Sequence, residues 1–192
     1  MRFNIIFFIT GVALLLIVAL FDVNYLTNKA PVPFSQWKTI SFYDFNGLKR
    51  PGYTINGVTE FAYIETNRKI EYTGNGIIRI TAYFYPSRSY VFDEHIRNPD
   101  LLKHEIYHFY ITEYFTRLLR REIKAFNGTV TRHIINGLNK KYIRFEDEMQ
   151  KLYDEETYHS YIMQFQKKWE KSLDDELLSL YDFSNPDVSL KN

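Results

Sequence analysis

The most regular pattern of apolar and polar positions lies midway along the chain, where apolar side chains recur at helical spacing. On a helical wheel these side chains share one face with two histidines, while basic residues take the opposite face. Asn98-Pro99-Asp100 combines an N-cap, a first-turn proline and a first-turn acid, and Asn127-Gly128 is a stop signal. The pattern therefore predicts a long helix over residues 99–126 with its histidine face turned into the protein.

Ahead of this helix the pattern favours strands. Residues 38–45, 58–72 and 77–85 are rich in β-branched and aromatic side chains, and Thr73-Gly74-Asn75-Gly76 is a hairpin signal between the last two segments. After the helix, further helical spacing predicts a second helix between residues 131 and 153 and a third over residues 155–180. A sheet followed by helices predicts an α+β fold, with a small antiparallel sheet and a three-helix half. The tail over residues 182–192 is expected to fray.

An apolar run near the N-terminus changes this picture. Residues 5–21 are broken only by Thr10 and Gly11, follow Arg2, and precede Asp22. Such a run predicts a membrane-targeting segment, a signal anchor or a signal peptide, within residues 1–28. The residues after the run offer no good cleavage site, which favours an uncleaved anchor over a removed signal. The expected location is outside the cytoplasm, either membrane-anchored on the extracytoplasmic side or, after cleavage, secreted or periplasmic.

Composition narrows the function classes for residues 29–192. Over the whole chain 24 basic residues oppose 23 acidic ones, and the two signs are interspersed, which argues against a nucleic-acid partner. There is no cysteine, so disulfides and a lipoprotein anchor are excluded, while 16 Tyr and 16 Phe supply material for one core. The expected organisation is one domain behind the N-terminal segment.

The main candidate for a chemical site is His104-Glu105-Ile106-Tyr107-His108, which falls in the first turns of the predicted helix. Histidines four apart lie about 40° apart around a helix, so both imidazoles can reach one metal ion, and the Glu can lie beside its open position. This is the His-Glu-x-x-His spacing of a catalytic zinc site. The alternative is a pair of core histidines, but two unpaired buried imidazoles would each cost a desolvation penalty that a metal removes. The motif predicts a Zn²⁺ site in a zincin-like metallopeptidase domain.

Four blocks in the same order also make the chain resemble a bacterial family of predicted secreted zinc-dependent proteases. Residues 40–47 resemble the family's L-x-W-x-D-F-x-G stretch, and residues 89–91 resemble its S-W-V. Residues 101–109 resemble its L-L-K-H-E-x-x-H-F, and residues 153–159 resemble its Y-D-x-x-T-x-H-G, followed by Gln166 and Trp169 at its Q-x-x-W. The resemblance implies a metal site first and proteolysis second.

The chain departs from the family at four positions that leave the His-Glu-x-x-His intact. Phe42 and Tyr90 stand where the family has Trp, Tyr110 stands where Asp is usual, and Ser160 replaces the Gly after His159. These departures bear on loops and on the substrate side of the site.

The third metal ligand is not fixed by the motif, because a catalytic zinc site uses three protein ligands and leaves one position open. His159 is the favoured candidate, since it would lie at the start of the third helix, and Glu155 and Glu156 are alternatives from the same turn. Glu113 matches an acid of the family but would point about 180° away from His104, so it is interpreted as an ion-pair partner of Arg117.

The expected mechanism assigns catalysis to Glu105, which would take a proton from a zinc-activated water and pass it to the leaving amine. Tyr153 and Tyr158, with Tyr107, are candidate donors to the oxyanion, and the strand over residues 77–85 could bind a peptide or protein substrate along its edge. Two alternatives stay open: a non-catalytic envelope binding protein stabilised by a metal, and a metal-dependent amidase acting on cell-wall peptides. The carboxylate of Glu105 favours catalysis over the first.

Overall fold

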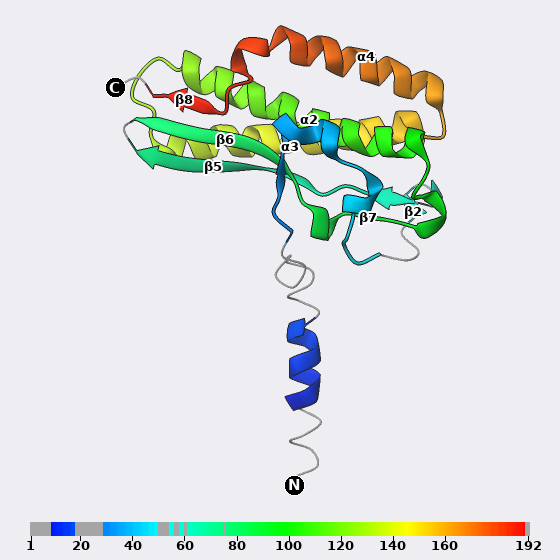
Figure 1. Ribbon diagram of the computed structural model, residues 1–192. Coiled ribbons are helices and arrows are strands. Elements are labelled where there is room, and N and C mark those ends of the chain that lie inside the picture. The colour runs from blue at the N-terminus through cyan, green and yellow to red at the C-terminus, as the bar shows by residue number, and fades with distance from the viewer. Residues whose placement is uncertain are drawn as a thin grey trace.

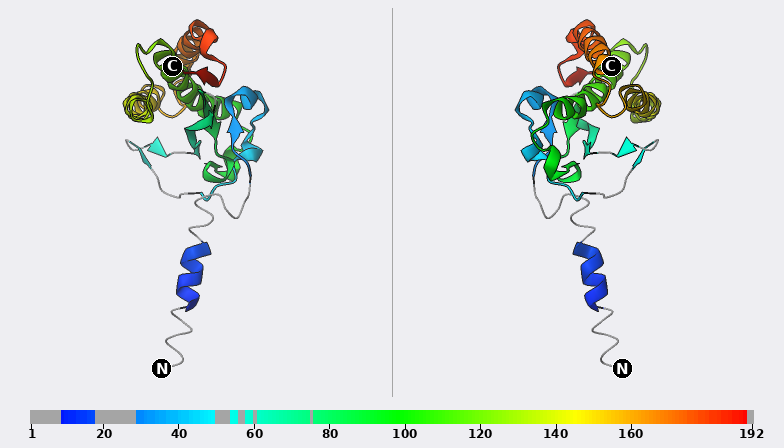
Figure 2. Two further views of the ribbon diagram at one scale, coloured as in Figure 1. Left: turned by 90° about the vertical axis from the view of Figure 1, so that its left-hand side faces the viewer. Right: turned by 90° about the vertical axis from the view of Figure 1, so that its right-hand side faces the viewer.

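The computed structural model describes residues 9–17, 29–49, 54–55, 58–59, 61–74 and 76–190. Figure 1 shows a small antiparallel sheet and three long helices, α2 (Pro99–Ala125), α3 (Arg132–Thr157) and α4 (Met163–Ser179). This α+β arrangement confirms the expected fold class. The side views in Figure 2 show α2 beside the sheet and beside both other helices, and α2 contacts all three. The histidine-bearing helix is therefore the central element of the molecule.

The main sheet is built around β6 (Ile77–Phe84). On one side β6 pairs antiparallel with β5 (Thr66–Gly74), and Gly74 holds a φ of 87° at the turn, so the predicted hairpin is confirmed. On the other side β6 pairs with β1 (Val32–Pro33) and with β8 (Asp187–Ser189). Two short ladders complete the strands, one between β2 (Thr54–Ile55) and β3 (Val58–Thr59) and one between β4 (Ala62–Tyr63) and β7 (Tyr90–Val91).

The predicted strand over residues 38–45 is wrong. Two short 3₁₀ helices, η1 (Phe34–Thr39) and η2 (Phe42–Asp44), occupy this stretch. Asp44 Oδ2 accepts hydrogen bonds from the backbone N and the Oγ of Ser41, at 2.9 and 3.0 Å, and this capping turn competes with an extended backbone. The predicted strand over residues 58–72 is likewise divided, into β3, β4 and β5. Three further 3₁₀ turns are η3 (Pro86–Arg88), η4 (Asp93–His95) and η5 (Tyr181–Phe183).

The boundary between the last two helices also differs from the prediction. The third helix was expected from residue 155, yet α3 continues to Thr157 and α4 begins only at Met163. The apolar spacing of α3 extends through Tyr153 to Thr157, and both side chains are fully buried. Because no Gly or Pro marks the end of α3, the sequence carries no local stop signal there. As a result His159 lies in the turn between two helices.

The tail over residues 182–192 was expected to fray, and this is also wrong for the residues described. After η5 the chain returns to the sheet, where β8 pairs with the edge of β6 and Arg79 binds Asp187 through two hydrogen bonds of 2.7 and 2.9 Å. This return covers part of the α2 face that the helical wheel assigned to solvent. Glu113 and Arg120 on that face are consequently buried.

The N-terminal apolar run lies partly outside the described residues, which include only residues 9–17 of it. These nine positions form a helix with exposed side chains, drawn apart from the sheet and helices in Figure 1. Among the described parts of the chain, no helix has both the length and the apolar character needed to cross a membrane.

Candidate metal centre

Helix α2 sets the position of both motif histidines. The Asn98 side chain caps the helix by accepting hydrogen bonds from the backbone N of Asp100 and Leu101, both at 3.1 Å. The second turn of α2 then carries His104 and Glu105, both buried, and His108 follows one turn later with 13% of its side chain exposed. The predicted inward orientation of the motif is confirmed.

The turn between α3 and α4 presents His159 through unusual backbone geometry. Tyr158, His159 and Ser160 hold φ angles of 50°, 49° and 75°, in the left-handed region that side-chain-bearing residues rarely adopt. The His159 backbone N donates to Asp154 O at 3.2 Å, which closes this turn against the end of α3. Such strain is typical of segments whose shape is fixed by function. Here it directs a buried imidazole back toward α2.

Three imidazoles converge on one carboxylate oxygen at the centre of the site. Asp154 Oδ1 lies 3.1 Å from His104 Nε2, 3.0 Å from His108 Nε2 and 3.4 Å from His159 Nδ1. The two motif histidines approach each other to 3.2 Å between their Nε2 atoms. Donor atoms of His104, Asp154 and His159 all lie within 4.8 Å of one another, close enough to hold one metal ion.

The electrostatics of this cluster favour a positive charge at its centre. Burial lowers the pKa of His104 to about 4, so this imidazole is neutral. Burial acts the same way on His108, but the Asp154 carboxylate outweighs it, with help from Glu105, and raises the pKa of His108 to about 9. Burial alone would raise the pKa of Asp154, yet His108 and the hydrogen bonds from the three imidazoles hold it well below its usual range. Asp154 is therefore ionised among the imidazoles.

A second layer of contacts orients the imidazoles. Gln150 Oε1 accepts from His108 Nδ1 at 2.5 Å, and Gln150 Nε2 donates to His108 O at 3.0 Å, so one amide holds both the ring and its backbone. The ring of Tyr153 stacks on His104 with centroids 4.6 Å apart. With Nδ1 of His108 engaged by Gln150, its Nε2 is the atom that faces the cluster, as metal-binding imidazoles require.

The donor set could hold a metal ion. Four atoms at about 2.0–2.1 Å around a tetrahedral zinc ion lie about 3.3–3.4 Å from one another, and nitrogen and carboxylate oxygen are ordinary zinc ligands. The four separations given above range from 3.0 to 3.4 Å, while the donor atoms of His104, Asp154 and His159 as a set lie within 4.8 Å of one another. The layer of contacts that orients the imidazoles is incomplete at His104, whose buried Nδ1 has no hydrogen-bond partner among the described residues.

The structure separates the candidates for the third ligand. His159 reaches the cluster, whereas the two alternatives are engaged elsewhere: Glu155 lies 3.6 Å from Lys151, and Glu156 accepts from Trp169 Nε1 at 2.7 Å. Sequence reasoning missed Asp154, which lies nearest to all the imidazoles. The available signal was its place in the Y-D-x-x-T-x-H block, five residues before His159.

The candidate oxyanion donors and the candidate substrate strand are placed less favourably. The Tyr153 hydroxyl is buried and donates to His104 O at 3.4 Å, and the Tyr107 hydroxyl donates to Asp174 at 3.1 Å. Tyr158, next to His159 in sequence, is half exposed. The strand over residues 77–85 is β6, whose two edges pair with other strands, so an incoming peptide cannot pair along it. Among the described strands of this sheet, β5 is the long one paired on one edge only.

Glu113, the acid that follows the motif, lies on the far side of α2. Its Oε1 accepts from Arg117 Nε at 2.9 Å and from Arg120 Nη1 at 3.0 Å. The predicted ion pair with Arg117 is confirmed, and a second pair with Arg120 is buried with it.

No family model, no curated protein and no solved structure matches this chain.

Proposed function

We propose that the protein is a zinc-dependent peptidase in which His104, His108 and His159 hold the ion and Glu105 is the proton acceptor. The observation that carries the proposal is the convergence of three imidazole nitrogens within 3.4 Å of one point, the Asp154 Oδ1 atom, beside a buried glutamate on the same helix. A zinc ion bound there would polarise a scissile carbonyl and lower the pKa of a water toward neutrality.

The residues of the chain would then divide the work of hydrolysis. Glu105, buried next to His104 in sequence, would take the proton from the attacking water and return it to the leaving amine. Gln150 would keep the His108 ring turned toward the ion. Tyr158, half exposed at the turn, is the candidate donor with access to a substrate oxygen.

The order of the four motif blocks supports membership of the secreted zinc-dependent protease family, and this membership is part of the proposal. The apolar N-terminal run supports a site facing the extracytoplasmic side, reached by export. The substrate class that this argues for is a peptide or protein outside the cytoplasm, and a cell-wall peptide belongs to the same class.

A second candidate function follows from Asp154. If its carboxylate is a fourth ligand, the ion has no open position, which is the mark of a structural zinc site. The protein would then be a metal-stabilised binding protein of the cell envelope. The observation behind this alternative is that a fourth potential donor, Asp154 Oδ1, lies 3.0 to 3.4 Å from the three imidazoles.

The deciding variant for the first candidate is Glu105→Gln in the full-length chain. The amide keeps the shape of the side chain but cannot take a proton, so zinc content should stay at the wild-type level while cleavage falls on the order of a hundredfold or more. Zinc is measured by atomic absorption and cleavage with a mixed library of quenched fluorescent peptides. Glu155→Gln, which alters an exposed acid paired with Lys151, is the matched control and should change neither quantity. Full activity in Glu105→Gln would end the proposed mechanism.

Asp154→Ala separates the two candidates. Three imidazoles suffice for a catalytic ion, so under the peptidase proposal the variant retains zinc and cleavage. Loss of zinc in this variant, together with no cleavage by the wild-type chain, would establish the structural alternative instead.

A further inference from the structure

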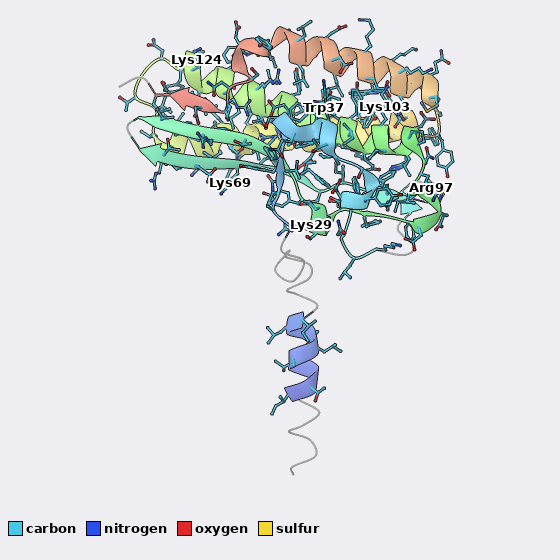
Figure 3. All side chains as sticks on the ribbon, in the orientation of Figure 1. Lys29, Trp37, Lys69, Arg97, Lys103 and Lys124 are labelled. Carbon is cyan, nitrogen blue, oxygen red and sulfur yellow. The ribbon has the colours of Figure 1, made fainter. Side chains whose placement is uncertain are left out.

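A cavity of about 390 Å³ lies on the face of α2 opposite the metal centre. Its walls come from η1, β6, α2 and the segment that follows η5, so elements from both ends of the chain enclose it. Figure 3 labels Trp37, which lies on η1 beside α2 and lines the cavity. The volume falls within the range of about 300–1,000 Å³ that small-molecule sites occupy.

One guanidinium in the wall is both fixed in place and left with free donors. Arg117 donates from Nε to Glu113 at 2.9 Å and from Nη1 to Leu177 O at 2.7 Å, which immobilises the planar group. Its Nη2 has no hydrogen-bond partner among the described residues. This nitrogen is not fully buried, so a ligand can reach it. A donor held in this way is preorganised for a carboxylate, because little conformational entropy is lost when the carboxylate binds.

The charges in the wall leave a surplus of one positive charge. Arg117 and Arg120 oppose the single carboxylate of Glu113. The donors of Arg120 are already engaged in contacts that hold the fold together. Arg120 donates to Ile80 O at 2.9 and 2.6 Å, to Phe183 O at 2.8 Å and to Glu113 at 3.0 Å. The two arginines share one carboxylate, so one positive charge is left over in the wall, and Arg117 is the member of the pair with N–H donors still available to a monoanionic ligand.

The rest of the wall is aromatic and hydroxylated. Phe34 and Trp37 each pack edge-on against Tyr110, with centroids 5.1 Å apart, so both rings are held rigidly. The hydroxyls of Ser35, Thr81 and Ser184 have no hydrogen-bond partner among the described residues. An apolar lining with a few convergent polar groups is the usual composition of a ligand site.

We propose that this cavity is a second binding site, distinct from the metal centre, for a small organic carboxylate that carries a flat apolar group. The carboxylate binds Arg117 Nη2, and the apolar group lies against Phe34 and Trp37. This site is independent of the proposed peptidase activity, because no residue of its wall belongs to the metal centre.

The test uses 3-phenylpropionate as the probe and isothermal titration calorimetry on the full-length chain. We expect saturable binding at one site with a dissociation constant of about 1 mM or lower, the range that ligand efficiency allows for a probe of this size. The alcohol 3-phenylpropan-1-ol keeps the ring but lacks the charge, and it should bind at least tenfold more weakly. Arg117→Gln should weaken binding of the acid at least tenfold.

Two further variants complete the design. Arg121→Gln removes a positive charge from an exposed position of the same helix and should leave binding unchanged. Arg117→Lys keeps the charge but loses the held guanidinium, so it should weaken binding several-fold, and full binding by this variant would overturn the proposal even where Arg117→Gln does not fold. Absence of saturable binding, equal binding of the acid and the alcohol, or full binding by Arg117→Gln would each overturn the proposal.

Discussion

The left-handed backbone of Tyr158, His159 and Ser160 is the least favourable local geometry among the described residues of the site. Each such residue other than glycine costs on the order of 1 kcal/mol or more, so the surrounding structure has to hold the turn in place. Burial of His159 and its 3.4 Å approach to Asp154 are the visible compensation, and a metal ion bound to His159 would add to it. The turn is therefore expected to respond to changes in both backbone and metal.

Ser160→Gly is expected to stabilise the protein by about 0.5–1 kcal/mol. Glycine adopts a φ of 75° without steric penalty, although its greater freedom in the unfolded chain offsets part of the gain. Thermal unfolding of the full-length chain measures the effect. Ser184→Gly, at a position with a φ of −72°, is the matched control and should bring no gain. A melting temperature below wild type for Ser160→Gly would show that the left-handed turn is not the source of strain.

His159→Ala is expected to lose most of the bound zinc. Removal of one of three imidazoles leaves two, and no nearby side chain other than Asp154 could replace it at about 2 Å from the ion. Zinc content after dialysis measures the loss. His133→Ala, an exposed histidine on α3, is the control and should keep its zinc. Zinc retained by His159→Ala would mean that Asp154 completes the ligand set with His104 and His108.

At the scale of residues, the sequence was informative where chemistry follows local spacing. The four-residue spacing of His104 and His108 places both rings on one helix face wherever that helix occurs. Asp154 could not be found in this way, because its proximity depends on how far α3 continues and on how α3 packs against α2. That packing is a property of side chains distant in sequence.

Among the elements, α2 was predictable almost to the residue because its limits are coded locally by Asn98, Pro99 and Asn127-Gly128. The strand expected over residues 38–45 failed because a single side-chain contact, Ser41 with Asp44, selects a 3₁₀ turn over an extended chain. The predicted start of α4 was wrong because the strained turn sets the end of α3, and no glycine or proline in the sequence marks that end.

Glu113→Ala tests how α2 is held against the sheet. The substitution leaves Arg120 buried without its carboxylate, and breaking a buried pair typically costs about 3–5 kcal/mol of unfolding free energy. Zinc content should stay unchanged, since Glu113 lies on the far face of α2. Urea unfolding and metal analysis on the same sample measure both quantities.

Glu155→Ala, which removes an exposed pair with Lys151, is the control for this loss and should cost about 1 kcal/mol or less. An empty metal site in folded Glu113→Ala would contradict the assignment of Glu113 to the ion pair. If the alanine variant does not fold, Glu113→Gln provides the same measurement with the side-chain volume kept.

For the whole molecule, the α+β class followed from the order of periodicities along the chain, and the sheet-then-helices arrangement is confirmed. The fold of the tail could not be predicted in this way. Asp187 pairs with Arg79, which lies 108 residues away in sequence, and no residue near Asp187 signals the pairing. For the same reason the charged face of α2, assigned to solvent by its pattern, lies partly under the returning tail. Long-range pairing of this kind is beyond local sequence signals.

Export is the prediction that concerns the chain as a unit. A C-terminal alkaline phosphatase fusion, active only outside the cytoplasm, should be active, and a β-galactosidase fusion should be inactive. Deletion of residues 2–21 should reverse both results, because the apolar run that directs export is removed. Phosphatase activity that survives the deletion, or a wild-type fusion active only in the cytoplasm, would contradict the assignment.

The pairing of β8 with β6 also fixes the order in which the chain can become native. On the edge of β6 that faces away from β5, Ile77, Ile78 and Arg79 pair with Ser189, Val188 and Asp187, which a ribosome makes more than a hundred residues later. A chain that emerges N-terminus first therefore keeps three of the eight residues of its central strand unpaired on that edge until synthesis is almost complete. During that interval the open edge is available to chaperones or to a neighbouring chain, and a nonsense mutation that removes only the last few residues would leave it open permanently.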